Sequence, residues 1–148
     1  GPVPTWAVEV KHIALVGNNG KNNDFNVAKM LSPYLKDRSL MHDIQRLKTD
    51  PFCSRQAVIG YCFDYSFETV AEARKIFENE QETLDNIFEV CKKVDAKSGR
   101  YSVLDLVDFA DDIFVSRDLV KPAQTLSFGP TWRHPAGGYG WLFGWEIK

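Results

Sequence analysis

A glutamate and a lysine two residues apart, Glu9 and Lys11, are the first residues of this chain whose types and spacing could perform chemistry. They fall within Trp6–Val16, a stretch rich in apolar residues that predicts a β-strand. Side chains two positions apart on a strand share a face, so the two charged groups should lie about 7 Å apart along the strand. Val8 and Val10 are expected to be buried.

This pair is suited to the hydrolysis of a phosphodiester. A carboxylate such as Glu9 can hold Mg²⁺ or Mn²⁺, and the carbonyl oxygen of Val10 is a further candidate ligand. An ammonium group on the same face can position a water molecule and stabilise charge on the phosphate oxygens. The alternative is an exposed face of an edge strand, where charges discourage pairing with other chains. The short pattern alone favours this alternative, because it arises often by chance.

A second acid is needed for most metal sites, and Asp64 is the candidate. Gln56–Phe63 is apolar nearly throughout, which is typical of a strand buried on both faces. A helical pattern at Asp37–Leu47 connects it to the first strand, so the two strands should be parallel in a βαβ unit. Asp64 directly follows the second strand, at the edge where open α/β sheets bind ligands.

Five residues are candidates for contact with the phosphates of a nucleic acid. They lie in an Asn-rich loop, at the break between two helical stretches, and in a late loop rich in Gly and aromatic residues: Lys21, Lys36, Arg38, Arg133 and His134. The alternatives are a flexible surface loop, a solvated helix face and a packed loop whose histidine bonds to the backbone. The solvated alternative is favoured for Arg46 and Lys48.

The C-terminal stretch Tyr139–Ile147 predicts a last strand with Trp141, Phe143 and Trp145 on one face. These rings suit a core or a subunit interface better than stacking on bases. A homodimer through this aromatic strand is therefore a further expectation.

The remaining pattern is less regular. It predicts helical structure over Glu68–Val94, a short helix starting at Ser102 and ending by Phe109, and short strands at Ile113–Arg117 and Thr125–Phe128.

The order of several motifs resembles a group of uncharacterised bacterial proteins related to the restriction-endonuclease-like PD-(D/E)xK nucleases. The motifs are Val8–Lys11, the Asn/Lys-rich loop, Ser32–Ser39, Ala57–Tyr65, Trp132–Pro135 and Phe143–Glu146. The resemblance implies that Glu9 binds metal, that Lys11 is the catalytic lysine, and that DNA is cut with Mg²⁺ or Mn²⁺ in defence against foreign DNA. The aspartate that precedes this triplet in the family has no counterpart upstream of Trp6. The domain would then be truncated or inactive, or Asp64 would replace that acid.

Composition limits the other classes of function. The 148 residues are 44% hydrophobic and carry a net charge of −2, which fits one globular domain without a global basic field. Three cysteines without a Cys-x-x-Cys pair argue against a zinc knuckle and for a reducing cytoplasm. No apolar run approaches the roughly 20 residues that span a membrane. Gly1-Pro2 resembles a tag scar, so further domains are expected upstream of a single domain at 3–148.

Together these observations predict an α/β fold, with α+β as an alternative. Its mixed sheet would have flanking helices and a restriction-endonuclease-like core containing one parallel βαβ unit. The predicted function is a metal-dependent endonuclease-like domain acting on DNA. The alternative is a catalytically incomplete module of the same fold that binds nucleic acid or protein.

Overall fold

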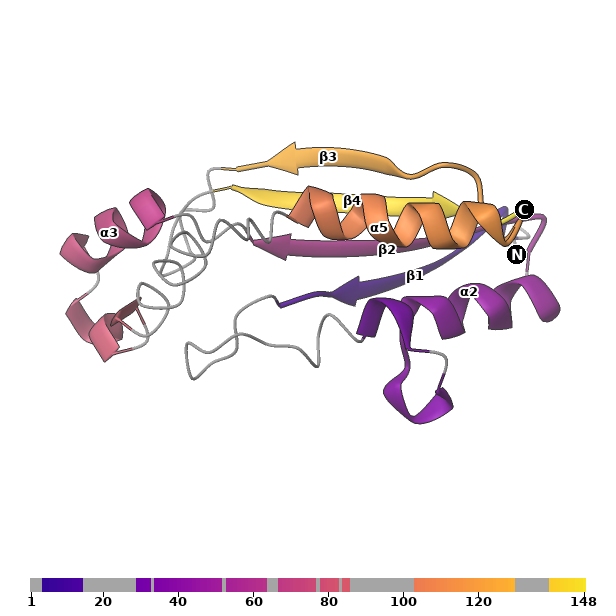
Figure 1. Ribbon diagram of the computed structural model, residues 1–148, viewed down its shortest axis with the longest axis horizontal. Helices are drawn as coiled ribbons and strands as arrows, with labels where there is room; N and C mark the ends of the chain where they lie inside the picture. Colours follow the sequence, from indigo (N-terminus) through magenta and orange to yellow (C-terminus); the bar gives the residue numbers. More distant parts are fainter. Residues whose placement is uncertain are drawn as a thin grey trace.

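Four strands form one mixed sheet in the order β1 (Trp6–His12), β2 (Arg55–Phe63), β4 (Gly140–Glu146) and β3 (Gln124–Phe128) (Figure 1). The computed structural model describes residues 4–14, 29–32, 34–51, 53–63, 67–76, 78–82, 84–85, 103–129 and 139–148. Strands β1 and β2 are parallel, whereas β4 is antiparallel to both β2 and β3. The prediction of a mixed α/β fold with one parallel pair is confirmed.

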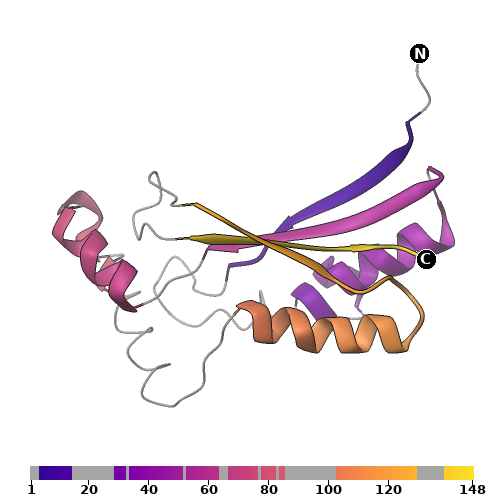
Figure 2. The same cartoon turned by 90° about the horizontal axis from the view of Figure 1, so that it is seen from above.

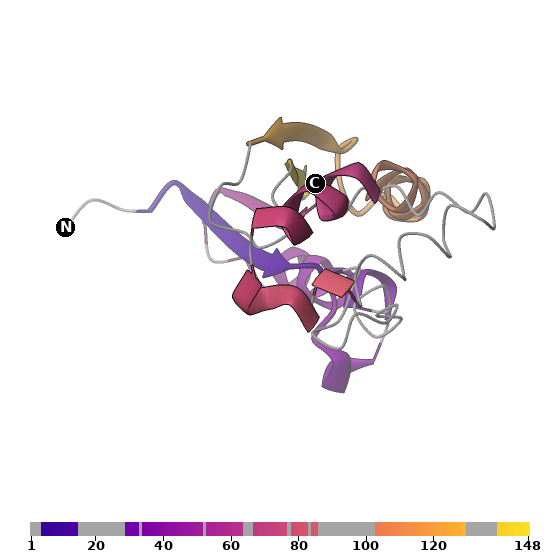
Figure 3. The same ribbon diagram turned by 90° about the vertical axis from the view of Figure 1, so that its left-hand side faces the viewer.

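Two helices, α2 (Leu40–Thr49) and α5 (Val103–Ser116), lie on the same side of the sheet (Figure 2). A third, α3 (Phe67–Ile76), lies beyond the ends of the strands and is followed by the 3₁₀ turn η2 (Glu78–Glu80). Figure 3 shows the arrangement from that end of the molecule. The described helices therefore cover one face of the sheet and leave the other uncovered.

Helix α2 begins three residues later than its apolar spacing predicts. The 3₁₀ turn η1 (Leu35–Asp37) precedes it, and Arg38 then takes a left-handed conformation with φ of 46°. Ser39 is the N-cap, and its Oγ accepts a hydrogen bond of 3.0 Å from the backbone N–H of His42. This cap satisfies one of the free donors of the first turn and fixes where the helix starts.

The core lies between the two helices and one face of the sheet. Phe143 and Trp145 of β4 are 2% and 1% exposed, and the Trp145 ring packs edge-on against Phe114 of α5 at 5.1 Å. Trp145 Nε1 also donates a hydrogen bond of 2.8 Å to Asp111 Oδ1. For these two rings the predicted core role is confirmed. The homodimer stays a prediction, and it would have to use other residues of the strand.

The predicted strand at Ile113–Arg117 is wrong, because these residues form the end of α5 and the turn after it. The buried side chains of α5 recur every three or four positions: Val103, Val107, Ala110 and Phe114. This stripe continues past the point where a short helix was expected to stop. Apolar residues alternate in this segment because the positions on either side of the buried stripe are also partly buried.

Strand β1 faces the opposite way from the prediction. Val8 and Val10 are 47% and 56% exposed, whereas Glu9 and Lys11 point to the side of the sheet that the helices cover. Ile13, two residues further along that face, is buried. The acid–lysine pair therefore faces α2, and the valines belong to the open face.

Candidate functional site

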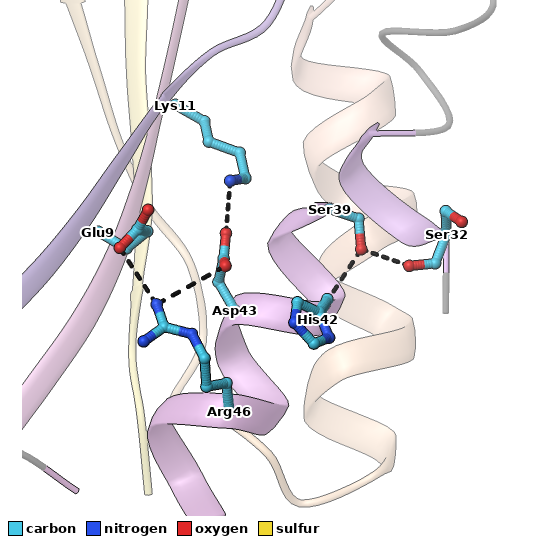
Figure 4. Close-up of polar contacts among 7 residues, drawn as sticks. All are labelled: Glu9, Lys11, Ser32, Ser39, His42, Asp43 and Arg46. Carbon is cyan, nitrogen blue, oxygen red and sulfur yellow. Dashed lines mark hydrogen bonds and ion pairs between the residues drawn. The ribbon is translucent and has the colours of Figure 1, made fainter. Parts of the chain in front are cut away.

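Glu9 and Lys11 of β1 meet two charged side chains of α2, Asp43 and Arg46 (Figure 4). Lys11 Nζ lies 2.6 Å from Asp43 Oδ2, and Arg46 Nη2 lies 3.3 Å from Glu9 Oε2. The same guanidinium nitrogen is 3.8 Å from Asp43 Oδ1. Four charged groups from a strand and the helix that follows it therefore form one network.

Asp43 is the central residue of the network, and the sequence interpretation missed it. Its side chain is 7% exposed, whereas those of Glu9 and Arg46 are 40% and 38% exposed. It lies on the buried stripe of α2, beside Leu40 and Leu47 at helical spacing. An acid within an apolar stripe was the available signal, because a buried carboxylate needs a counter-charge.

Asp43 lies in the first turn of α2. The N-terminal end of a helix carries partial positive charge, which stabilises a nearby carboxylate. Lys11, with a side chain only 16% exposed, adds a full positive charge. Oδ2 is buried and has no hydrogen bond of ordinary geometry. Its 2.6 Å contact with Lys11 Nζ is therefore a charge contact, which does not depend on the angle.

An open pocket of about 500 Å³ lies over the network. Four cationic and two anionic side chains line it, together with Leu35 and His42: Lys11, Lys36, Arg38, Arg46, Glu9 and Asp43. The predicted phosphate contacts Lys36 and Arg38 thus lie beside the acid–lysine pair. Arg46, for which the sequence favoured a solvated helix face, and His42 line the same pocket. The excess of positive charge suits an anionic ligand such as a phosphodiester.

A second pocket, of about 620 Å³, shares Lys11, Lys36 and Arg38 with the first. Its other charged or titratable residues are Lys29, Asp37 and His12. The cationic side chains therefore extend from α2 around the edge of β1.

The other predicted contacts are not brought to this site by the described part of the chain. Asp64, Lys21, Arg133 and His134 lie outside the described residues. Lys48 donates a hydrogen bond of 2.7 Å to the carbonyl oxygen of Asp118, so it has a structural role at the far end of α2.

No family model, curated protein or solved structure matches this chain. The geometry of this network is therefore the basis for assigning a function. None of the described helices combines the length and the apolar character that crossing a bilayer requires.

The acid pair fits a divalent cation of the Mg²⁺ type. Glu9 and Asp43 both approach Arg46 Nη2, so their carboxylates converge on one position that a positive charge occupies. Mg²⁺ is commonly held by one or two carboxylates, with water and phosphate oxygens completing its shell. Within the described residues no group of three or more His, Cys, Asp or Glu could hold a metal, so a site of the zinc type is not seen there.

His12, at the end of β1, should titrate below its ordinary pKa of 6.5. Burial lowers the pKa, and the nearby charge of Lys29 lowers it further. Between the lowered pKa and 6.5 the unfolded chain binds more protons, so the free energy of unfolding should fall as the pH falls through that window. An NMR titration of the ring should give a midpoint below 6.5, and a His12→Gln variant should show a shallower loss of stability. A midpoint at or above 6.5 would contradict this prediction.

Proposed function

We propose that this chain is a metal-dependent endonuclease-like domain with a restriction-like core, which hydrolyses DNA phosphodiester bonds in defence against foreign DNA. Glu9 and Asp43 hold Mg²⁺ or Mn²⁺, and Lys11 assists the attacking water. The observation that carries the proposal is the 2.6 Å contact between Lys11 and Asp43, since it adds an acid to the glutamate–lysine pair.

The contacts give each residue a distinct task. Asp43 holds Lys11 in place, so the ammonium group meets a substrate at a fixed position without first being ordered. Lys36 and Arg38, on the rim of the pocket, neutralise phosphates on either side of the bond to be cut. A bound divalent cation would polarise the phosphate and lower the pKa of water.

The test is cleavage of plasmid DNA with Mg²⁺ or Mn²⁺. Lys11→Ala should reduce the rate about 100-fold or more, because it removes charge stabilisation that acts in the transition state. Lys48→Ala is the matched control, since this lysine lies on α2, the helix that carries Asp43, but bonds to the Asp118 carbonyl. Cleavage by Lys11→Ala at the wild-type rate would overturn the proposal.

A further pair of variants identifies the second acid. Asp43→Asn should abolish the metal-dependent cleavage, whereas Asp64→Asn should leave that cleavage intact. The reverse result would assign the metal to Asp64, as the sequence interpretation expected.

A catalytically incomplete binding module is the second candidate, and one observation favours it. Arg46 already neutralises both carboxylates, with Nη2 within 4 Å of each. In a module of this kind, DNA would bind without metal and with a strong dependence on salt, and no condition would give cleavage. An Arg46→Ala variant that gains cleavage with metal would instead show that the guanidinium blocks a competent site.

A further inference from the structure

The face of the sheet opposite α2 and α5 is left uncovered by the described helices (Figure 2), and several of its apolar side chains are exposed. Trp6, Val8 and Val10 of β1 are at least 40% exposed there, and Leu126 of β3 is 62% exposed. Large exposed apolar surfaces generally mark a binding site.

Four aromatic rings cross this face where β1 and β2 end. His12 stacks on Tyr61 with ring centres 4.9 Å apart, and Phe63 lies 6.0 Å from His12. Phe128 of β3 is 6.1 Å from Phe63 and lies over Gly140, where a Cβ atom would meet its ring at 2.1 Å. Glycine on β4 thus makes room for the fourth ring, and the row continues from one edge of the sheet to the other.

The row begins at the cationic pocket. His12 both lines the pocket of about 620 Å³ and forms the first ring of the row. The pocket carries four cationic side chains against one anionic side chain, although the whole chain has a net charge of −2. Positive charge is therefore concentrated at the edge where the rings start.

We propose that this face binds single-stranded nucleic acid, with unpaired bases stacked on the ring row and phosphates held at the cationic pocket. Single strands offer both a negative backbone and free base faces, and proteins bind them with aromatic platforms beside positive grooves. A duplex keeps its base faces stacked inside, so it could use the cations but not the rings. A second copy of this chain would cover the apolar residues but would not explain the excess of cationic side chains at the pocket. This binding requires no hydrolysis, so it goes beyond the nuclease proposal.

The experiment measures binding of a fluorescein-labelled thymidine oligonucleotide, about 12 nucleotides long, by anisotropy in EDTA, where no metal-dependent cleavage occurs. Tyr61→Leu and His12→Ala, which remove rings, should each weaken binding about 10-fold, the effect typical of losing one stacked base. Leu126→Ala is the matched control, because it removes an exposed apolar side chain of the same face outside the ring row. Lys36→Ala should weaken binding and reduce its dependence on salt.

The possible results separate the two proposals. Loss of binding in the ring variants, with cleavage of duplex DNA unchanged, supports a single-strand platform on this face. Wild-type affinity in both ring variants overturns it, whatever Lys11→Ala does to cleavage. A dimer in sedimentation velocity that Val10→Glu dissolves would also overturn it, since the face would then belong to a second copy. Equal affinity for the single strand and its duplex would show that the rings do not stack on unpaired bases. That result would also overturn the proposal.

Discussion

Replacing Asp43 with alanine should lower the free energy of unfolding by about 3 kcal/mol, because it leaves the mostly buried ammonium of Lys11 without a counter-charge. The side chain of Lys11 is 16% exposed and its nearest described anion is Asp43 Oδ2 at 2.6 Å. The variant must keep this charge at a mostly buried position without its partner, which is costly. Urea denaturation of wild type and variant measures the difference.

Two controls distinguish burial from mere loss of a salt bridge. Glu9→Ala breaks the more exposed contact with Arg46, so it should cost less than about 1 kcal/mol. The double variant Lys11→Met/Asp43→Leu removes both charges and should recover most of the stability. If Asp43→Ala and Glu9→Ala lower the free energy of unfolding equally, burial of Asp43 and Lys11 adds nothing to the stability of the network.

The double variant also separates the structural role from the proposed chemistry. It should be folded and yet unable to cleave DNA, because Lys11 and one acid are gone. Cleavage by this folded variant would show that the network only stabilises the domain.

The elements that the sequence predicted well are those whose apolar spacing matches their local packing. Gln56–Phe63 was expected as a strand buried on both faces; the observed β2 (Arg55–Phe63) matches its bounds within one residue, but only one of its faces is fully buried, because the described helices cover one side of the sheet. Its neighbour β1 was expected to be parallel, since a helix connects the two, and it is. The insertion of β4 between β2 and β3 had no local signal, because it depends on pairing between residues such as Tyr61 and Leu142 that are distant in sequence.

The site was predicted only in part, again because some of its contacts join residues that are distant in sequence. Glu9 and Lys11 could be recognised because both lie on one short strand, whereas their partner Asp43 is 32 or more positions away on a helix. The orientation of β1 was inverted because either set of alternate side chains could have faced the core. The counter-charge of Asp43 on α2 decides the orientation, because it offsets the desolvation cost of Lys11. Val8 and Val10 are then left exposed.

Gly60→Ala should destabilise the domain by about 3 kcal/mol, which is the upper part of the usual range for overpacking. A Cβ atom at Gly60 would lie 2.1 Å from Cε2 of Phe143. That ring is 2% exposed and packs against Trp145 with ring centres 5.8 Å apart, so it has no free space to move into. Thermal or urea unfolding measures the loss, and Phe143→Leu in the same chain should restore part of it.

Gly140→Ala is the matched control, because its Cβ atom would lie the same 2.1 Å from the Phe128 ring. Phe128 is only partly buried and belongs to the edge strand β3, so its ring can turn away from Gly140 into solvent. This variant should therefore cost less than about 1 kcal/mol, and the smaller conformational entropy of unfolded alanine offsets part of that cost. A loss as large as that of Gly60→Ala would show that the Phe128 ring is held as rigidly as Phe143. In that case the ring row would be a fixed platform, and single-strand binding should weaken in Gly140→Ala as well.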